Sequence, residues 1–172
     1  DFVIDTTAPT LTEVTAIATP GSDTTPSYVY STNEAGTLTS SLAFSSSTSA
    51  VTGNNTITFT TLAEGTYSGE TITLTDAAGN SASLTLSDFV IDTTAPVADA
   101  SSLSDVTAQC SVTSLTAPTA TDNCSGTVTG TTTTSLPITT QGTTVVTWTY
   151  TDDSGNTSTQ TQNVVIDDTT AP

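Results

Sequence analysis

One nine-residue motif occurs twice in this sequence and returns a third time in altered form, which predicts a repeated architecture. The stretch DFVIDTTAP occupies 1–9 and 88–96, and VVIDDTTAP occupies 164–172. Each copy joins a strand-like apolar run to an Asp, two Thr and an Ala-Pro, and the Pro stiffens the exit from the strand. We interpret the motif as a joint between consecutive domains. Because the sequence begins and ends on it, we expect a segment of a longer protein.

A second motif keeps the same register and places the domain boundary. TDAAGNSAS at 75–83 matches TDDSGNTST at 151–159, an offset of 76 residues. In both places its Asp precedes the Asp of the next joint by 16 residues. The sequence therefore predicts two units, 1–94 and 95–172, each the size of one small sandwich domain.

Short runs in both units alternate Thr or Ser with aliphatic or aromatic residues, and Gly, Asn, Asp and Pro separate them. This alternation is typical of half-buried strands, and the regular spacing favours an all-β sandwich in each unit. The expected strands are 10–17, 27–32, 36–44, 55–62, 70–76, 81–91, 104–112, 126–134, 143–152 and 158–166.

The offset of 76 residues also aligns candidate core residues of the two units. It places Ile72 and Leu74 on Trp148 and Tyr150, and all four alternate with Thr. One face of this strand should therefore pack in the core while the other faces water. We interpret Trp148 as a core residue.

The stretch LAEGTYSGETI predicts a tyrosine corner in the first unit, formed by Leu62, Gly65 and Tyr67. In immunoglobulin-like sandwiches such a Tyr pins the connection that precedes strand F. The run 70–76 would then be strand F, and 81–91 strand G. The fold class that we predict is thus two tandem immunoglobulin-like β-sandwich domains.

The charge of the chain excludes several classes of function. It has 17 acidic residues and no Lys, Arg or His, so its net charge is -17. Nucleic acid and anionic membrane surfaces both need positive charge on their partner. No apolar run is long enough to insert into a membrane. Without His, Lys or Arg there is no ordinary general base and no phosphate clamp, so we expect no enzyme.

The two cysteines, Cys110 and Cys124, lie 14 positions apart. They form no C-x-x-C pair, and no His is present to complete a zinc site. A disulfide between them is the expected state, because the composition resembles that of extracellular proteins.

The second unit contains DTTAPV, then a Cys followed by APTATDNCSG, and then TTVVTWTYTDDSGNTSTQTQNVVIDD. Through these stretches it resembles the hyalin-repeat (HYR) domain, an immunoglobulin-like sandwich of extracellular and adhesive proteins. The first unit resembles the immunoglobulin-like repeats of large bacterial surface adhesins, through TPSYVYSTNEAGTL, NNTITFTTLAEGTYSGETITLTDAAGNSAS and DFVIDTTAP. The resemblance implies an extracellular, cell-surface adhesin, with the gliding-motility adhesins of Bacteroidota as one such group. Relatives of the first unit often carry a Cys pair that this unit lacks, so another feature must hold it.

Acidic residues recur at the end of each sandwich where the chain enters. For the second unit the candidate Ca²⁺ ligands are Asp92 of the joint, Asp122 of the expected B–C turn, and Asp152 and Asn156 of the F–G turn. The same logic selects ligands at the start of the first unit: Asp5, Glu34, Asp76 and Asn80. Oxygen-only ligands favour Ca²⁺ over zinc or copper, and the adhesin resemblance implies that calcium stiffens domain junctions. D-x-x-G-N is also a good turn sequence without any metal, so a purely structural turn stays open.

Two functions remain after these exclusions. The first is a structural spacer in an extracellular stalk, whose partners are the neighbouring repeat domains of the same chain, with host or substratum ligands bound through other domains. The alternative is a module that binds carbohydrate or a surface ligand through Thr-rich strand faces such as TVTGTTTTS.

Overall fold

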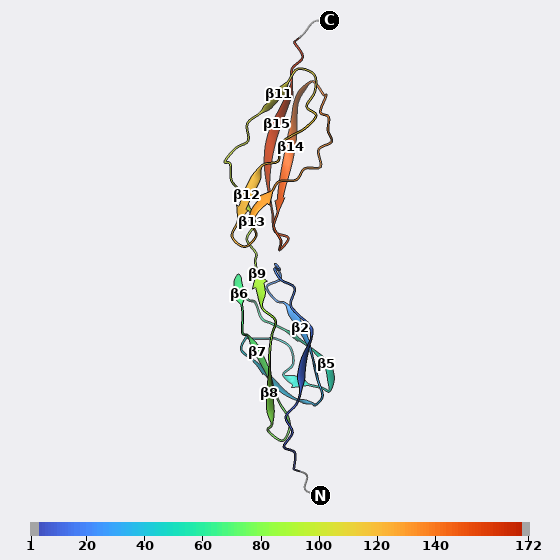
Figure 1. Ribbon diagram of the computed structural model, residues 1–172, viewed down its shortest axis with the longest axis vertical. Helices are drawn as coiled ribbons and strands as arrows, with labels where there is room; N and C mark the ends of the chain where they lie inside the picture. The colour runs from blue at the N-terminus through green and yellow to red at the C-terminus, as the bar shows by residue number, and fades with distance from the viewer. Residues whose placement is uncertain (1–3, 170–172) are drawn as a thin grey trace. The chain divides into compact units, whose positions relative to one another are not determined.

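The structure is a computed structural model that describes residues 4–169, and it divides after Asp92 into two compact units. The division lies two residues before the predicted boundary. Each unit is built from strands and turns (Figure 1), which confirms the predicted all-β fold of two tandem sandwich domains. The described residues contain no helix that is long and apolar enough to cross a membrane.

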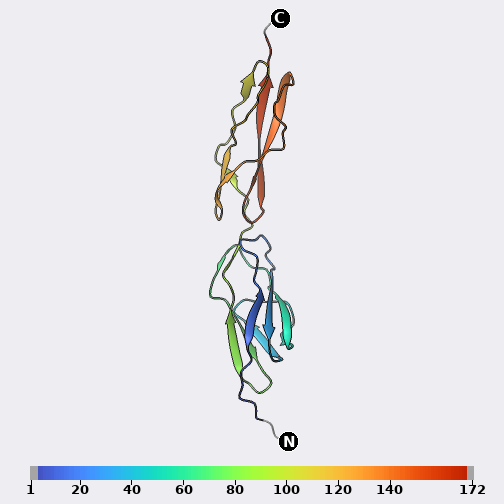
Figure 2. The ribbon, with the colours of Figure 1, turned by 45° about the vertical axis from the view of Figure 1, so that its right-hand side comes forward.

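The first unit is a sandwich of two main sheets. Its strands are β1 (Leu11–Thr15), β2 (Ser27–Thr32), β3 (Gly36–Ser40), β4 (Ser49–Ala50), β5 (Gly53–Thr58), β6 (Gly65–Tyr67), β7 (Thr71–Thr75), β8 (Ser81–Thr85) and β9 (Phe89–Ile91). One sheet has the order β1-β2-β5 and the other β4-β3-β7-β8, while β6 pairs with β9 (Figure 2). If β2, β3, β5 and β7 are taken as strands B, C, E and F, this is the A-B-E and C-F-G division of an immunoglobulin-like sandwich.

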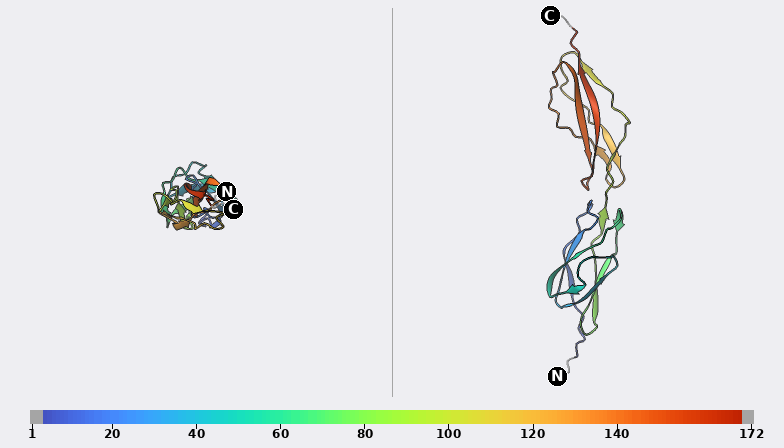
Figure 3. Two further views of the ribbon diagram at one scale, coloured as in Figure 1. Left: turned by 90° about the horizontal axis from the view of Figure 1, so that it is seen from above. Right: turned by 180° about the vertical axis from the view of Figure 1, so that it is seen from behind.

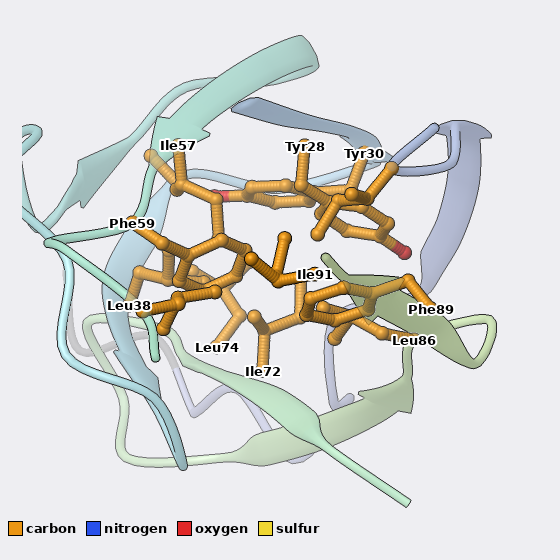
Figure 4. Packing of buried hydrophobic residues seen from close by; sticks show 13 residues of the cluster. Tyr28, Tyr30, Leu38, Ile57, Phe59, Ile72, Leu74, Leu86, Phe89 and Ile91 are labelled. Atoms are coloured by element: carbon orange, nitrogen blue, oxygen red, sulfur yellow. The ribbon is translucent and has the colours of Figure 1, made fainter. Parts of the chain in front are cut away.

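The core of the first unit lies between these two sheets. Tyr28, Tyr30 and Ile57 reach in from one sheet, and Ile72 and Leu74 reach in from the other (Figure 4). On β7 the burial alternates residue by residue, as the Thr-Ile-Thr-Leu-Thr pattern predicts. The exposed Thr and Ser of the β7–β8 hairpin bond to one another across the strands, with Thr73 to Ser83 at 2.7 Å and Thr75 to Ser81 at 2.8 Å.

The second unit is a smaller sandwich. Its strands are β10 (Val97–Ala98), β11 (Val106–Ala108), β12 (Thr119–Asp122), β13 (Gly126–Thr129), β14 (Gly142–Thr151) and β15 (Thr157–Ile166). One sheet has the order β10-β12-β13 and the other β11-β15-β14. The β14–β15 hairpin is paired over ten residues and forms the longest ladder of the described chain (Figure 1).

Trp148 packs in the core of the second unit, as predicted, and is 3% exposed. It lies between Val146 and Tyr150 on the inner face of β14, and all three are buried. The indole Nε1 donates to Oε1 of Gln162 at 3.1 Å. The hydroxyl of Tyr150 donates to Gln160 at 2.7 Å. Both polar atoms are thus satisfied inside the sandwich, as buried Trp and Tyr require.

The tyrosine corner is present in the first unit. The hydroxyl of Tyr67 donates to the carbonyl of Ala63 at 2.9 Å, four residues upstream. Its ring stacks on Phe89 of β9, with centroids 4.9 Å apart and an interplanar angle of 7°. Tyr67 therefore ties the connection before β7 to the last strand of the unit.

The predicted strand 81–91 is wrong as one continuous element. It is two strands, β8 and β9, which belong to different sheets. Between them Leu86 packs into the core at 4% exposure, and residues 86–88 belong to neither strand. The expected B–C turn was to contain Asp122, but residues 119–122 form β12, which ends at Asp122 and pairs with β13.

Glu13 of β1 bonds to Ser87, between β8 and β9, and so supplies a long-range contact in a unit that has no cysteine. Its Oε1 accepts the hydroxyl of Ser87 at 2.8 Å, and its Oε2 accepts the Ser87 amide at 3.1 Å. Burial acts to raise the pKa of Glu13, but these two bonds to Ser87 hold that pKa below its ordinary value. The ionised carboxylate thus ties together residues 74 positions apart.

Replacing Tyr67 with Phe should destabilise the first unit by about 0.5–1.5 kcal/mol, because the variant loses one hydrogen bond to Ala63 and keeps the ring stack. Urea unfolding followed by circular dichroism measures the change. Tyr67→Ala also loses the stack on Phe89 and should cost more. A Phe variant as unstable as the Ala variant would show that the hydroxyl, not the ring, dominates.

Candidate metal centre

The turn between β7 and β8 is organised by the carboxylate of Asp76. Its Oδ1 accepts the amides of Ala78 at 2.8 Å and Asn80 at 2.9 Å. Its Oδ2 accepts the side-chain amide of Asn80 at 2.9 Å. Gly79 has a φ of 94°, which only glycine adopts without strain, and this explains the Gly of the D-x-x-G-N motif.

The turn between β14 and β15 repeats this geometry. Oδ1 of Asp152 accepts the amides of Ser154 at 2.9 Å and Asn156 at 2.8 Å. The Asn156 side chain donates to Oδ2 at 2.9 Å, and Gly155 has a φ of 88°. The motif therefore builds the same turn twice, with one buried aspartate at its centre each time.

Three carboxylates converge at the entry end of the first unit. They are those of Asp5, Glu34 and Asp76, and one oxygen of each lies within 4.8 Å of the others. Asp5 is exposed, Glu34 is half-buried and Asp76 is 8% exposed. These residues line an open depression of about 550 Å³ together with Asn33 and Thr52. The joint, the β2–β3 turn and the β7–β8 turn thus each supply one acid.

The β2–β3 turn is held in place by its own polar contacts. The Thr32 hydroxyl donates to the Glu34 carbonyl at 3.0 Å. Asn33 accepts the amide of Thr10 at 2.6 Å and donates to Glu34 Oε1 at 3.2 Å, so it links the incoming chain to the acid. At Gly36 an added Cβ would lie 2.4 Å from the Thr75 carbonyl, so glycine lets the turn approach the residue before Asp76.

Sequence reasoning missed Asn33. The available signal was its place directly before Glu34, in a turn between two strands. A polar side chain there can reach both the acid and the entering segment.

Within the second unit, Asp122 and Asp152 lie together. A carboxylate oxygen of one is within 4.8 Å of one of the other, although they are 30 positions apart in the chain. Asp122 ends β12, and its Oδ1 accepts the amides of Cys124 at 2.9 Å and Ser125 at 2.7 Å. The two turns are joined by the amide of Asp153, which donates to the Ser125 hydroxyl at 3.0 Å.

The second oxygen of Asp122 is the unusual atom of this pair. Asp122 is only 5% exposed, and its Oδ2 is buried with no hydrogen-bond partner among residues 4–169. An unpartnered buried carboxylate oxygen costs free energy unless a donor or a cation reaches it. No Lys, Arg or His exists in the sequence to do so. This atom fits a metal ligand.

The side-chain amides of the two predicted asparagines bond to the central carboxylates. Nδ2 of Asn80 donates to Oδ2 of Asp76 and to the backbone carbonyl of Asp5 at 3.2 Å. Nδ2 of Asn156 donates to Oδ2 of Asp152. Both amides therefore orient the central carboxylate, as residues around a metal ligand commonly do.

Asp92 is the last residue of the first unit. Its amide donates to the carbonyl of Gly21 at 3.0 Å, which fixes the backbone at the joint. The prediction that Asp92 joins Asp122 and Asp152 in one site remains a prediction.

Hydrogen bonding lowers the pKa of Asp76 below its ordinary value. The Asn80 side chain contributes most, burial opposes it, and the amides of Asn80, Ala78 and Gly79 add to the lowering. Because the folded-state pKa lies below the unfolded one, the turn is stabilised above the unfolded pKa and loses that stability as the pH falls through the folded pKa. At neutral pH Asp76 is therefore ionised and contributes a negative charge to the cluster of the first unit.

The predicted disulfide between Cys110 and Cys124 is wrong for this fold. No disulfide joins the two exposed residues. Cys110 follows β11, whose Ala108 pairs with Ile166 at one end of β15. Cys124 lies in the β12–β13 turn, beside the turn that precedes the other end of β15. Ten extended residues span about 30 Å, whereas a disulfide needs Cα atoms within about 7 Å.

Residues 93–166 match the family described as HYR-like domain with 4 cysteines. This range covers most of the second unit and less than half of the chain, so the match describes that unit. The chain has two cysteines where the family description has four. Comparison with curated protein sequences finds no significant match.

Two solved structures are similar over most of this chain. The protocadherin gammaB7 EC3-6 cis-dimer structure shares 15% identity at a TM-score of 0.40, over 93% of this chain and 51% of that one. The protocadherin gamma B2 extracellular cadherin domains 1-5 share 12% at a TM-score of 0.39, over 95% and 41%. The chain spans about half the length of these structures or less.

Replacing Asn80 with Ala should raise the pKa of Asp76, because its amide is the largest cause of the lowered value. The acid-induced loss of turn stability should then begin at a higher pH than in the wild type. Carboxyl-carbon NMR titration in the presence of a chelator measures both. Ser83→Ala removes a hydroxyl from the same hairpin and should leave this pKa unchanged. An equal shift in both variants would assign the effect to the hairpin as a whole.

Proposed function

We propose that this segment is a structural spacer of a large extracellular, cell-surface adhesin, in which Ca²⁺ at the entry end of each sandwich stiffens the joint. The observation that carries the proposal is that the buried aspartate of the same D-x-x-G-N turn has an acid from another part of the same unit beside it in two different sandwiches. A turn that served only its own hairpin would not need an acid from a second turn beside it.

The internal repeat supplies the third ligand of the second corner. Asp5 and Asp92 occupy the same place in identical copies of DFVIDTTAP. Asp76 and Asp152 occupy the same place in matching turns. Glu34 lies two residues after β2, the central strand of its sheet, and Asp122 is the last residue of β12, the central strand of its sheet. Asp92 therefore corresponds to Asp5, and we assign it to Asp122 and Asp152.

The chemistry of the donors selects the ion. Three carboxylates offer up to six oxygens, and Ca²⁺ takes six to eight at flexible geometry. No His is present, and the only two thiols do not belong to the acidic set, so zinc and copper are disfavoured. In the second unit, Oδ2 of Asp122 is a buried oxygen that accepts no hydrogen bond from the described residues and is therefore open to a cation.

The surroundings of the molecule follow from its charge and its family match. The HYR-like match of residues 93–166 supports an adhesion-type repeat. A charge of -17 without one basic residue suits an environment rich in divalent cations better than one rich in polyanions. The partners that we assign are neighbouring repeat domains of the same chain. Adhesive contacts with a host or substratum, a bacterial source and its group belong to the same proposal.

Carbohydrate binding is the weaker candidate. Sugar sites commonly use an exposed aromatic face, and the single Trp of the chain, Trp148, is buried and bonded to Gln162. The exposed hydroxyls of the β7–β8 hairpin are paired with one another. These observations favour the spacer.

Millimolar Ca²⁺ should raise the melting temperature of both units, because an ion that binds only the folded state stabilises it by about 2.7 kcal/mol at 100 times its dissociation constant. Differential scanning calorimetry of the chelator-treated chain with and without Ca²⁺ measures the shift. Small-angle scattering in the same titration reports the range of bending at the joint.

Matched variants separate ligand binding from general charge. Asp76→Asn should abolish the Ca²⁺-dependent shift of the first unit, and Asp122→Asn that of the second. Glu70→Gln and Asp105→Asn remove one charge from each unit outside the clusters and should keep the shift. If Ca²⁺ changes neither melting nor bending in the wild type, the turns are purely structural.

A further inference from the structure

In each unit the chain enters at one end of the sandwich and leaves at the other (Figure 3). In the first unit, Asp5 lies beside the β7–β8 turn, and Asp92 follows β9 at the opposite end. In the second unit, Pro96 contacts Ser158 at the start of β15, and the chain leaves after Ile166 at its far end. A pull on the two ends of either unit therefore runs along its strands.

The first segment of each unit changes sheets on its way across. In the first unit β1 pairs antiparallel with β2, and Gly21 then forms a parallel bridge with Ile91. In the second unit β10 pairs antiparallel with β12, and β11 then pairs parallel with β15. Two sandwiches with little sequence in common thus share one arrangement of their terminal strands.

In each unit the parallel contact joins the entering segment, after its first strand, directly to the last strand. Gly21 donates to the Val90 carbonyl at 3.1 Å and accepts the Asp92 amide at 3.0 Å. Thr19 adds its hydroxyl, which accepts the Val90 amide at 2.9 Å. In the second unit three residue pairs form the contact, from Val106 with Val164 to Ala108 with Ile166, and Asp167 donates to the Ala108 carbonyl at 3.0 Å.

We propose that these parallel terminal contacts are the force-bearing elements of the two units. When the ends are pulled apart along parallel strands, all hydrogen bonds between the strands are loaded sideways at once and must fail together. Bonds pulled open from one end fail one after another and resist less. The proposal rests on the spacer role of the proposed function and needs no bound ion.

The second unit carries an additional lateral support. Three side chains on β15, two positions apart, bond to backbone carbonyls four positions apart in the entering segment. Ser158 contacts Pro96, Gln160 contacts Ala100 at 2.7 Å, and Gln162 contacts Ser104 at 3.0 Å. This row lies on the path by which force reaches β11. With three paired residues against one bridge, the second unit should hold longer than the first.

The test stretches the whole chain between its two ends at constant force, with a chelator present so that no cation contributes. Two steps are expected, one for each unit. Gly21 and Ile91 are 70 positions apart and Ala108 and Ile166 are 58 apart, so release lengthens the chain by about 25 nm and about 20 nm at about 3.6 Å per residue. The longer step should come first.

Proline and alanine variants show which unit produces each unfolding step. The Ala108 carbonyl accepts from Asp167, directly after β15, so in this parallel register its N–H also points at β15, whereas the N–H and carbonyl of Thr107 point away. Ala108→Pro should speed the shorter step about three- to tenfold, by loss of one hydrogen bond that resists unfolding. Thr107→Pro introduces the same ring at a residue that faces away from β15. After correction for its effect on equilibrium stability, this variant should leave the rate of the shorter step unchanged. Thr19→Ala should speed only the longer step, with Thr12→Ala as its control.

A second pulling direction needs no destabilising change. In Cys124→Ser the single thiol, Cys110, lies just beyond β11, at the end of β15 where the chain leaves. Stretching between Cys110 and the C-terminus opens the β11–β15 contact from one end. The second unit should then unfold at a clearly lower force than when it is pulled by both ends. Equal forces in the two directions, or equal effects of Ala108→Pro and Thr107→Pro, would overturn the proposal.

Discussion

The absence of any basic side chain is the constraint on which the rest of this structure depends. Seventeen carboxylates share the chain with no Lys, Arg or His. Each of them must be satisfied by an N–H, by a hydroxyl, by water or by a cation from outside. Glu13 takes the amide and hydroxyl of Ser87, and Asp99 takes the hydroxyls of Thr119 and Thr121, which lower its pKa. The abundant Thr and Ser thus compensate for the missing cations, because their hydroxyls donate hydrogen bonds to carboxylates that would otherwise need a basic side chain.

In the acidic clusters around Asp76 and Asp152, the hydrogen-bond donors of the chain no longer suffice for the carboxylates. Around Asp76 and Asp152 the turn amides saturate one oxygen, and an asparagine side chain orients the other. A second acid then stands next to each, and no donor of the described chain reaches Oδ2 of Asp122. The folding of each sandwich therefore assembles a negative site whose neutralisation depends on the solution. In the proposed function, that dependence lets the ion concentration control the stiffness of the joint.

Local sequence patterns predicted the elements better than their connections. Alternation placed β7 and β14 correctly, including the buried faces of Leu74 and Trp148, because period-two burial is written residue by residue. It could not show that 81–91 is interrupted at 86–88, since both halves alternate and the Glu13 contact with Ser87 comes from a distant strand. The cysteine prediction failed for a related reason. Spacing along the chain says nothing of which end of β15 each thiol occupies. The convergence of Asp5, Glu34 and Asp76 was predictable only through an assumed topology.

Entry at one end and exit at the other also has a consequence for how such a chain changes in evolution. Each core closes on residues of its own unit, and every unit begins and ends in the same short joint. Duplicating or deleting the stretch between two joints leaves the residues of every remaining core unchanged and restores an intact DTTAP sequence at the new junction. The length of the protein can therefore vary in whole units through single genetic events, with no interior residue having to adapt.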